Sequence, residues 1–408
     1  ESSFVASLAD YAALALDRSD PLAAARGSFE IEEGTIYLVG HSLGPPPVQA
    51  RRKAEAALDT WRSDLVRGWN SAGWIDLAER TGDRLARLIG AEQGSVVVTD
   101  NVSVNLFKLA AAALGLCRRA ILVIEEDEFP TDQYIVAALG NLQRIEVRRV
   151  PAGEGIAALK EGGVLIKSAV NYRSAGIADI TAHEAEARRH GALIVWDLSH
   201  ATGVLNLRLR ANGALLATGC TYKYLNGGPG APAFVHAASE IAGKLSSPLP
   251  GWMGHAAPFA FEAGYTPRGG AARFASGTPP ILSLASLDGA LDVVTGQALA
   301  DLQAKAQALG AITIARAKAM GIALLSPEDD ARRGGHVSIR ITQGYPVVQA
   351  LAARGVLADF RAPDTVRFGF SPLFLKFGQV WDAMEILADI LSTRSWDAPE
   401  FHIRAKVT

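Results

Sequence analysis

The sequence predicts an α/β fold: a large domain whose mainly parallel sheet is sandwiched by helices, followed by a small C-terminal α+β domain. Two patterns predict it. From about residue 95, short and almost continuously apolar runs alternate with helical stretches, as expected for strands buried on both faces of a parallel sheet. After about residue 286 the alternation gives way to one long helix and then a helix–strand–helix pattern. A chain of 408 residues is long enough for both domains.

The apolar runs are the expected strands of the large domain. They lie at Val96–Thr99, Ala120–Ile124, Ile145–Val147, Gly163–Ile166, Leu193–Trp196 and Leu215–Ala217. In the small domain we expect a helix at Leu299–Met320 and a strand at Val337–Arg340. The chain is therefore expected to divide into an N-terminal segment (1–45), a large domain (46–285) and a small domain (286–408).

One expected helix positions a candidate functional carboxylate. Thr181 and Glu184 form the spacing of a capping box, which predicts a helix start, and Gly191 predicts its left-handed end. The strand at Leu193 follows directly, so Asp197 is expected at its carboxyl end. Open α/β sheets bind their ligands at that edge.

Charge and cysteine content exclude several classes of partner. A formal net charge of −2 gives no electrostatic footprint for nucleic acid or an anionic membrane. The two cysteines, Cys117 and Cys220, cannot form a disulfide framework, which favours a reducing, cytoplasmic setting. Residues 1–20 lack the basic region of a secretory signal and are expected to form an amphipathic helix. We expect no metal.

Lys223 is the strongest single candidate for chemistry. It lies between Tyr222 and Tyr224 and is followed by the glycine-rich run 227–230, which would allow backbone to approach a ligand. An amine that forms a Schiff base needs such a sheltered position. Asp197 lies 26 residues upstream, so one crossover could bring both to the same sheet edge. A lysine with a carboxylate for a pyridine nitrogen is the pair that pyridoxal phosphate (PLP) requires.

Two further features fit that cofactor, although a structural role explains His200 equally well and explains residues 99–105 more simply when each is taken alone. His200 follows Asp197 by three residues and could orient the site. Residues 99–105 separate a strand from a helix, and the exposed backbone N–H groups at that helix start suit a phosphate.

The chain resembles kynureninase, a fold-type-I PLP enzyme family, over roughly residues 35 to 380. Seven separated motifs carry the resemblance: Tyr37–Gly44 (YLVGHSLG), Ser103–Leu106 (SVNL), Phe129–Asp132 (FPTD), Val195–His200 (VWDLSH), Tyr222–Asn226 (YKYLN), Gly251–His255 (GWMGH) and Thr278–Ile281 (TPPI). The resemblance implies hydrolytic Cβ–Cγ cleavage of L-kynurenine to anthranilate and L-alanine in tryptophan degradation. It also implies a homodimer whose active site lies at the subunit interface.

The resemblance also implies a role for individual residues. Lys223 would hold the cofactor and act as the base at Cα, Asp197 would pair with the pyridine nitrogen, and Tyr222 would be the candidate proton donor or only a phosphate ligand. The other implied cofactor contacts are Val102, Ser103, Phe129, Pro130, Thr131, Asp132, Ser168, His200, Trp252 and Thr278. Trp252 and Thr278 would reach across the dimer. The implied substrate contacts are Arg367, for the α-carboxylate, with Trp69, His41 and Ser42.

The sequence departs from the vertebrate pattern at His41, where the family has asparagine. Trp69 and Gly277–Thr278 resemble the bacterial form, which implies a preference for kynurenine over its 3-hydroxy derivative.

Two alternatives are weaker. Gly40–Gly44 matches the G-x-S-x-G elbow of serine hydrolases around Ser42, but Pro45–Pro47 follow, and an elbow requires a helix to start at the serine. A cysteine desulfurase or related PLP lyase would need a reactive cysteine on a loop of the C-terminal half. Neither Cys117 nor Cys220 lies in such a place.

Overall fold

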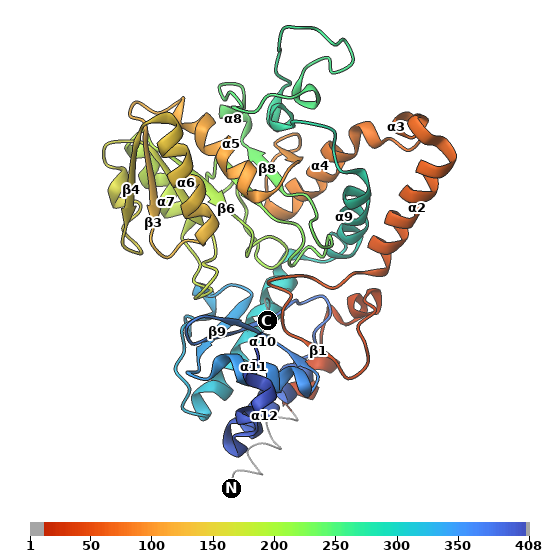
Figure 1. The fold of residues 1–408 in the computed structure, drawn as a ribbon, viewed down its shortest axis with the longest axis vertical. Helices are drawn as coiled ribbons and strands as arrows, with labels where there is room; N and C mark the ends of the chain where they lie inside the picture. The colour runs from red at the N-terminus through yellow and green to blue at the C-terminus, as the bar shows by residue number, and fades with distance from the viewer. Residues whose placement is uncertain (1–11, 405–408) are drawn as a thin grey trace.

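The computed structural model describes residues 12–404. A seven-stranded sheet forms the centre of its upper lobe in Figure 1. Its order is β2-β8-β7-β6-β5-β3-β4, and all neighbours are parallel except the two pairs made by β8. The strands are β2 (Val96–Val98), β3 (Ile121–Glu125), β4 (Glu146–Val150), β5 (Val164–Ser168), β6 (Leu193–Asp197), β7 (Leu216–Gly219) and β8 (Phe234–Ala237). The six strands predicted from apolar runs are thus confirmed.

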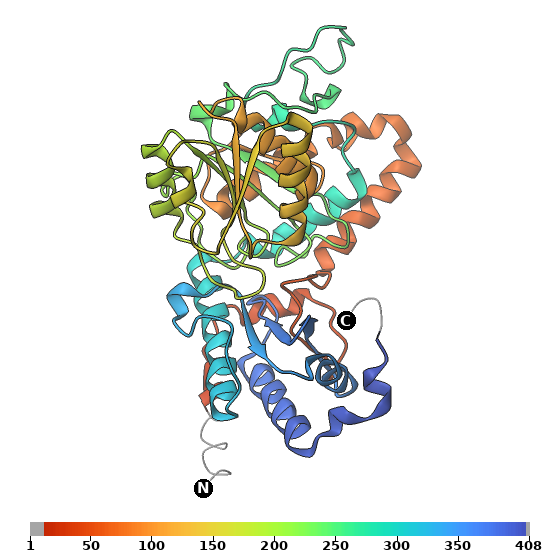
Figure 2. The same ribbon diagram turned by 60° about the vertical axis from the view of Figure 1, so that its left-hand side comes forward.

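Helices cover both faces of this sheet, and Figure 2 shows α6 and α7 on opposite sides of it. The helices of this lobe are α2 (Val48–Asp64), α3 (Gly68–Ser71), α4 (Leu77–Ile89), α5 (Val102–Leu114), α6 (Pro130–Gln143), α7 (Ile180–Arg189), α8 (Ser239–Ala242) and α9 (Ile281–Val294). Because β3, β5 and β6 are covered on both sides, almost all their residues are fully buried.

The lower lobe is built on a three-stranded antiparallel sheet of order β11-β12-β9. Its elements are β9 (His336–Arg340), β10 (Val356–Leu357), β11 (Asp359–Arg361), β12 (Thr365–Gly369), α10 (Leu299–Ala319), α11 (Gly344–Ala353) and α12 (Phe377–Thr393). The N-terminal strand β1 (Ile36–Tyr37) pairs with β10 in parallel. The segment that precedes α2 therefore belongs physically to the lower lobe.

Each lobe has its own hydrophobic core, and the two cores meet within α10. Leu302 and Ala306 pack in the upper core, whereas Leu309 and Ile314, one or two turns later, pack in the lower core. A helix shared by both cores ties the lobes together. The domain limits that the sequence suggested, 45/46 and 285/286, remain a prediction.

The expected capping box is wrong, although the helix it announced exists. Asp179, and not Thr181, is the N-cap of α7, and its side chain accepts a hydrogen bond from Ala182 N. Glu184 turns inward instead, where it accepts a hydrogen bond from the Trp196 indole at 2.7 Å. Gly191 does adopt the left-handed conformation expected of it, with φ +61°.

Part of the expected N-terminal helix, residues 1–11, lies outside the described residues; residues 12–18 are helical. None of the helices within residues 12–404 combines the length and apolar character that a membrane crossing requires.

Candidate active site

A cavity of about 390 Å³ opens at the carboxyl ends of β5 and β6. Register explains why several predicted residues meet there, because Ser168 on β5 lies opposite Asp197 on β6, which lies opposite Thr218 on β7. The cavity is lined by Asn101, Val102, Ser103, Val104, Phe129, Thr131, Asp132, Ser168, Tyr172, Asp197, Ser199, His200, Cys220, Tyr222, Lys223, Ala231 and Ala233. Ten of these were predicted as cofactor contacts.

Lys223 reaches this cavity from the loop that follows β7. Its Nζ lies 3.2 Å from His200 Nε2 and 5.9 Å from the centre of the Tyr222 ring. Within the described residues no carboxylate lies in ion-pair range of this amine. The loop is held from the N-terminal segment, since Gly44 N donates to the Tyr222 carbonyl at 2.8 Å. A Cβ at Gly44 would overlap Asn226 Oδ1 and the Lys223 carbonyl, so this approach requires glycine.

Asp197 presents one free carboxylate oxygen. Its Oδ1 accepts hydrogen bonds from Ser199 N at 2.8 Å and from Ser199 Oγ at 2.5 Å. No hydrogen bond to Oδ2 comes from residues 12–404. Burial raises the pKa of Asp197, while Ser199 and Lys223 oppose that rise. A cationic group at Oδ2 would therefore be favoured.

The start of α5, where a phosphate site was predicted, opens on the cavity. Asn101 is the N-cap, and its side chain accepts a hydrogen bond from Val104 N at 3.1 Å. The preceding N–H groups, those of Val102 and Ser103, have no acceptor within the helix. Together with the Ser103 hydroxyl, they form a site for an anion on the cavity wall.

Further buried acidic side chains lie near Asp197. Asp132 at the start of α6 is almost fully buried, and its Oδ2 has no hydrogen-bond partner in the described chain. Burial, with Asp197 and Glu128 nearby, raises the pKa of Asp132 well above its usual range. A positively charged ligand group would relieve this concentration of acidic side chains.

Tyr222 and Cys220 both line the cavity, but they differ in the chemistry that their side chains can perform. Burial, reinforced by the neighbouring Cys220, raises the pKa of the Tyr222 hydroxyl, so Tyr222 stays protonated and can donate a proton. Burial likewise raises the pKa of the Cys220 thiol, whose Sγ donates to the Ser199 carbonyl at 3.8 Å. Cys220 is therefore a poor nucleophile, which argues against the desulfurase alternative.

Arg367 and His41 lie behind the cavity wall, in the lower lobe. Arg367 is 2% exposed; its Nε and Nη2 donate to the two oxygens of Asp359, and its Nη1 donates to the Tyr172 carbonyl. His41 stacks on His336, with ring centres 5.2 Å apart and an interplanar angle of 17°. The pKa of His41 is lowered to about 4, mainly by burial and by Arg367, so His41 is neutral near pH 7.

The structure does not bring the remaining predicted residues to this cavity. Pro130 opens α6 beside Phe129 without lining the cavity, and Trp69 lies in α3 against Trp74. Trp252 opens the short 3-10 helix η5 (Trp252–Gly254), and Thr278 lies in the loop before α9. Figure 2 shows the green segment between α8 and α9 projecting away from the upper lobe.

Ser42 does not form a hydrolase elbow. Its N–H donates to the Val39 carbonyl in a turn, and α2 begins only at Val48. The serine hydrolase alternative therefore fails.

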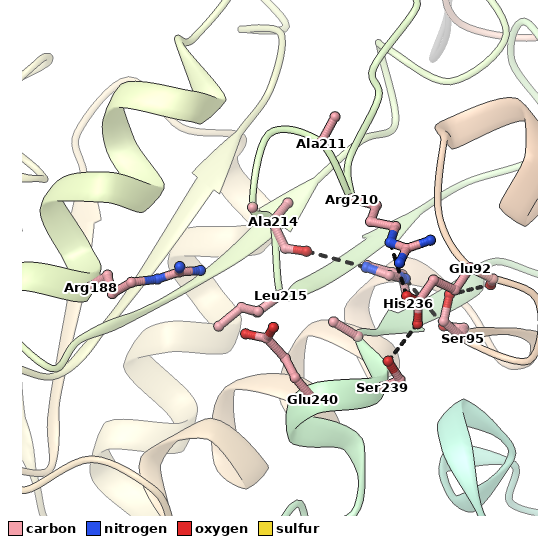
Figure 3. Close-up of a pocket in the computed structure, with 12 residues that line it drawn as sticks. Glu92, Ser95, Arg188, Arg210, Ala211, Ala214, Leu215, His236, Ser239 and Glu240 are labelled. Atoms are coloured by element: carbon pink, nitrogen blue, oxygen red, sulfur yellow. Dashed lines mark hydrogen bonds and ion pairs between the residues drawn. The ribbon is translucent and has the colours of Figure 1, made fainter.

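A second groove, at the amino ends of β2 and β7, offers different chemistry (Figure 3). Its polar groups largely bind one another. Arg210 pairs with Glu92 at 3.0 Å, and both ring nitrogens of His236 face backbone carbonyls, those of Ser95 and Ala214. No lysine lines this groove, so the Lys223 cavity is the better candidate.

The Lys223 cavity fits the cofactor that the resemblance implied. An amine without a carboxylate partner, a carboxylate oxygen open to a cation and N–H groups at a helix start are the three contacts that PLP needs. Ser199 and Tyr172 contribute although the sequence analysis missed them. A serine two residues after a strand-end aspartate was a usable signal for Ser199. Tyr172 carried no local signal.

Comparisons with known sequences point to one family. The family profile described as kynureninase C-terminal domain matches residues 302–387. A kynureninase of Pseudomonas fluorescens is 44% identical over 409 residues, which cover 97% of this chain and 98% of that protein. A kynureninase of Burkholderia pseudomallei (strain 1106a) is 44% identical over 412 residues, covering 97% and 99%.

Solved structures confirm the predicted fold class. The apo structure of a cysteine desulfurase from Thermococcus onnurineus NA1 superposes with a TM-score of 0.78 at 16% identity, covering 91% of this chain and 98% of that one. The complex of the cystine C-S lyase C-DES with cysteine persulfide gives 0.74 at 18% identity, covering 88% and 98%. At such identities the likeness concerns the fold alone.

Proposed function

Because the chain belongs to the kynureninase family, we propose that it uses pyridoxal phosphate to hydrolyse L-kynurenine to anthranilate and L-alanine. The observation that carries this proposal is the convergence of Lys223, Asp197 and the start of α5 on one cavity. In this proposal Lys223 would hold the cofactor, Asp197 would pair with its ring nitrogen, and Val102 and Ser103 would hold its phosphate. Phe129, at the start of α6, would pack against the ring.

The chemistry divides between the cofactor and the chain. Pyridoxal phosphate, when bound, is an electron sink for negative charge that develops next to the substrate amine. Lys223 would be the base that takes the proton from the substrate Cα. His200 accepts a hydrogen bond from Lys223, because burial and the nearby amine lower the pKa of His200 well below its usual range and keep the ring neutral.

Two other groups handle the substrate. Arg367 holds the α-carboxylate, which fixes the orientation of Cα and the γ-carbonyl. Water adds to the γ-carbonyl carbon and the Cβ–Cγ bond breaks, which releases anthranilate and leaves Cβ to be protonated. Tyr222, whose hydroxyl stays protonated, donates that proton; such a general acid contributes about 10²- to 10⁴-fold.

The second copy of the chain is part of this proposal. The turn that follows α2 and the loop near residue 260 expose large apolar side chains, with Val66 76% and Phe261 79% exposed. Exposed apolar patches of this kind mark contact surfaces. Trp252 and Thr278 lie outside the cavity of their own chain, which supports their reaching the cavity of a partner in a homodimer.

Light scattering tests the dimer. Val66→Asp and Phe261→Asp should give monomers, whereas Leu142→Asp, at a site 70% exposed on α6, should remain dimeric. A wild-type protein that is monomeric at micromolar concentration would refute the shared site.

Two finer assignments follow from the resemblance. We propose a cytoplasmic location, which the two unpaired cysteines support. We also propose a preference for kynurenine over 3-hydroxykynurenine, since Trp69 and Thr278 match the bacterial form. Comparing kcat/KM for the two substrates tests the preference, and a higher value for 3-hydroxykynurenine would refute it.

The activity is tested by incubating the purified protein and pyridoxal phosphate with L-kynurenine. Fluorescent anthranilate and L-alanine should appear in equal amounts, and Lys223→Ala should abolish both. Cofactor binding without turnover would keep the cavity assignment but require another amino-acid substrate.

A further inference from the structure

Most of the N–H groups of Arg367 already donate hydrogen bonds within the protein. A guanidinium has five N–H groups. Asp359 accepts two of them, from Nε at 2.7 Å and from Nη2 at 2.5 Å, and the Tyr172 carbonyl accepts one from Nη1 at 2.6 Å. Within residues 12–404 no other acceptor binds the group. One N–H each on Nη1 and Nη2 remains, which is the number that a carboxylate accepts in a bidentate pair.

Strand register puts Asp359 in this position. Asp359 on β11 lies directly opposite Arg367 on β12, so both side chains project from the same face of the small sheet. The sequence therefore fixes the pair through the short β11–β12 hairpin.

Asp359 is held as an anion by its other neighbours. Its Oδ2 lies 3.2 Å from Arg361 Nη2 and 3.5 Å from His41 Nε2. Burial alone would raise the pKa of Asp359, but His41, which is charged at the low pH where this carboxyl would titrate, and Arg367 hold that pKa well below its usual range. The carboxylate therefore stays charged throughout the pH range in which an enzyme is assayed.

Tyr172 connects this pair to the cavity. Its ring lines the cavity and meets the Phe129 ring edge to face, with centres 5.2 Å apart, while its carbonyl binds Arg367. Arg367 is therefore fixed from two sides, by a side chain of the lower lobe and by the backbone of the upper lobe. The bidentate Asp359 contact fixes the plane of the guanidinium, and the Tyr172 carbonyl holds its Nη1 end.

We propose that Asp359 is a positioning residue that, together with the Tyr172 carbonyl, turns Arg367 so that a single bidentate edge is offered to the substrate α-carboxylate. The inference rests on the proposed function, in which Arg367 binds that carboxylate. Asp359 does not touch the substrate. It fixes the orientation of Arg367. It also occupies the Nε–Nη2 edge, on which a substrate carboxylate would otherwise bind in the wrong orientation.

Asp359→Asn tests the proposal because it changes the charge while keeping the shape. Its amide N–H₂ would face a guanidinium donor and force Arg367 to turn. The probes are L-kynurenine and kynuramine, which is the same molecule without the α-carboxylate; binding is followed by the absorbance of the bound cofactor. The wild-type preference for L-kynurenine should fall by about 10-fold or more, the equivalent of one charge-assisted contact. Affinity for kynuramine should stay within about twofold.

Controls separate this proposal from the proposed function. Asp364→Asn, on the same hairpin and paired with Arg340 at 3.1 Å, should behave as wild type. Arg367→Gln should lose the preference for L-kynurenine over kynuramine. Adding Asp359→Asn to Arg367→Gln should cause no further loss of that preference. If Arg367→Gln keeps the preference, the assigned role of Arg367 fails. If Arg367→Gln loses the preference while Asp359→Asn retains it, only the positioning role fails.

A purely structural role for Asp359 gives a different result. Asp359→Asn would then weaken both probes equally, and that outcome would overturn the proposal. Should Asp359→Asn not fold, Asp359→Glu keeps the charge on a longer side chain and should lower the preference partially. Asp359→Glu should change the orientation of Arg367, so an unchanged preference for L-kynurenine in this variant would also contradict the positioning role.

Discussion

Replacing Asp197 with asparagine isolates the charge on which the proposed cofactor site depends. Ser199 donates to Asp197 Oδ1 from both its backbone and its hydroxyl, and an asparagine Oδ1 accepts the same two bonds. The change is therefore confined to Oδ2, the atom left open to the cavity. A hydrogen bond to a charged partner is worth about 1.5–3 kcal/mol.

That magnitude corresponds to a loss of about 10- to 150-fold in kcat, because each 1.36 kcal/mol is tenfold. The assay is anthranilate fluorescence at saturating L-kynurenine and pyridoxal phosphate. Ser199→Ala is the matched control, since it removes one hydrogen bond but leaves the charge, and its loss should be clearly smaller. An Asp197→Asn enzyme with wild-type kcat would refute the reasoning.

Three other changes give independent checks. Gly44→Ala adds a Cβ that overlaps the Lys223 loop, at a cost of about 1–3 kcal/mol, so it should lower the melting temperature and weaken cofactor binding. Gly243→Ala, whose added Cβ meets open space, should do neither. Gly369→Ala should destabilise the lower lobe because its Cβ overlaps the His41 ring, and adding His41→Ala should restore the melting temperature. Burial raises the pKa of Glu184 from 4.5 to about 7, so the folded chain keeps a proton that the unfolded chain releases above pH 4.5. Stability therefore falls by about 3 kcal/mol between pH 4.5 and 7. Glu184→Gln should remove that part of the decline in urea unfolding at pH 5 and pH 8, and an equal decline in both proteins would contradict the assignment.

Strands and strand ends could be predicted from the sequence because their signals are local. Buried parallel strands are apolar throughout, so β3, β5 and β6 were evident, and with them the position of Asp197. Strand β8 was missed because Phe234–Ala237 is short and follows a glycine- and proline-rich loop.

Side-chain choices within a pattern were harder to predict. Asp179 and Thr181 are both good caps, and the capping box was misassigned because Glu184 gains more from the buried Trp196 indole. The Asp359–Arg367 pair depends on the register of β11 and β12, which no local pattern reveals. Whether Trp252 and Thr278 reach a partner's cavity depends on a second chain and not on this sequence's local propensities.

The most direct test of the account is to find where the cofactor is attached. The protein that turns over L-kynurenine would be reduced with borohydride and digested, and the modified peptide identified by mass spectrometry. We expect one pyridoxyl phosphate group per chain, on Lys223, with activity lost in proportion. Attachment to Lys167 would contradict it. That nearby amine is instead bound to Glu125 at 2.6 Å and Glu128 at 3.1 Å, and is expected to stay unmodified.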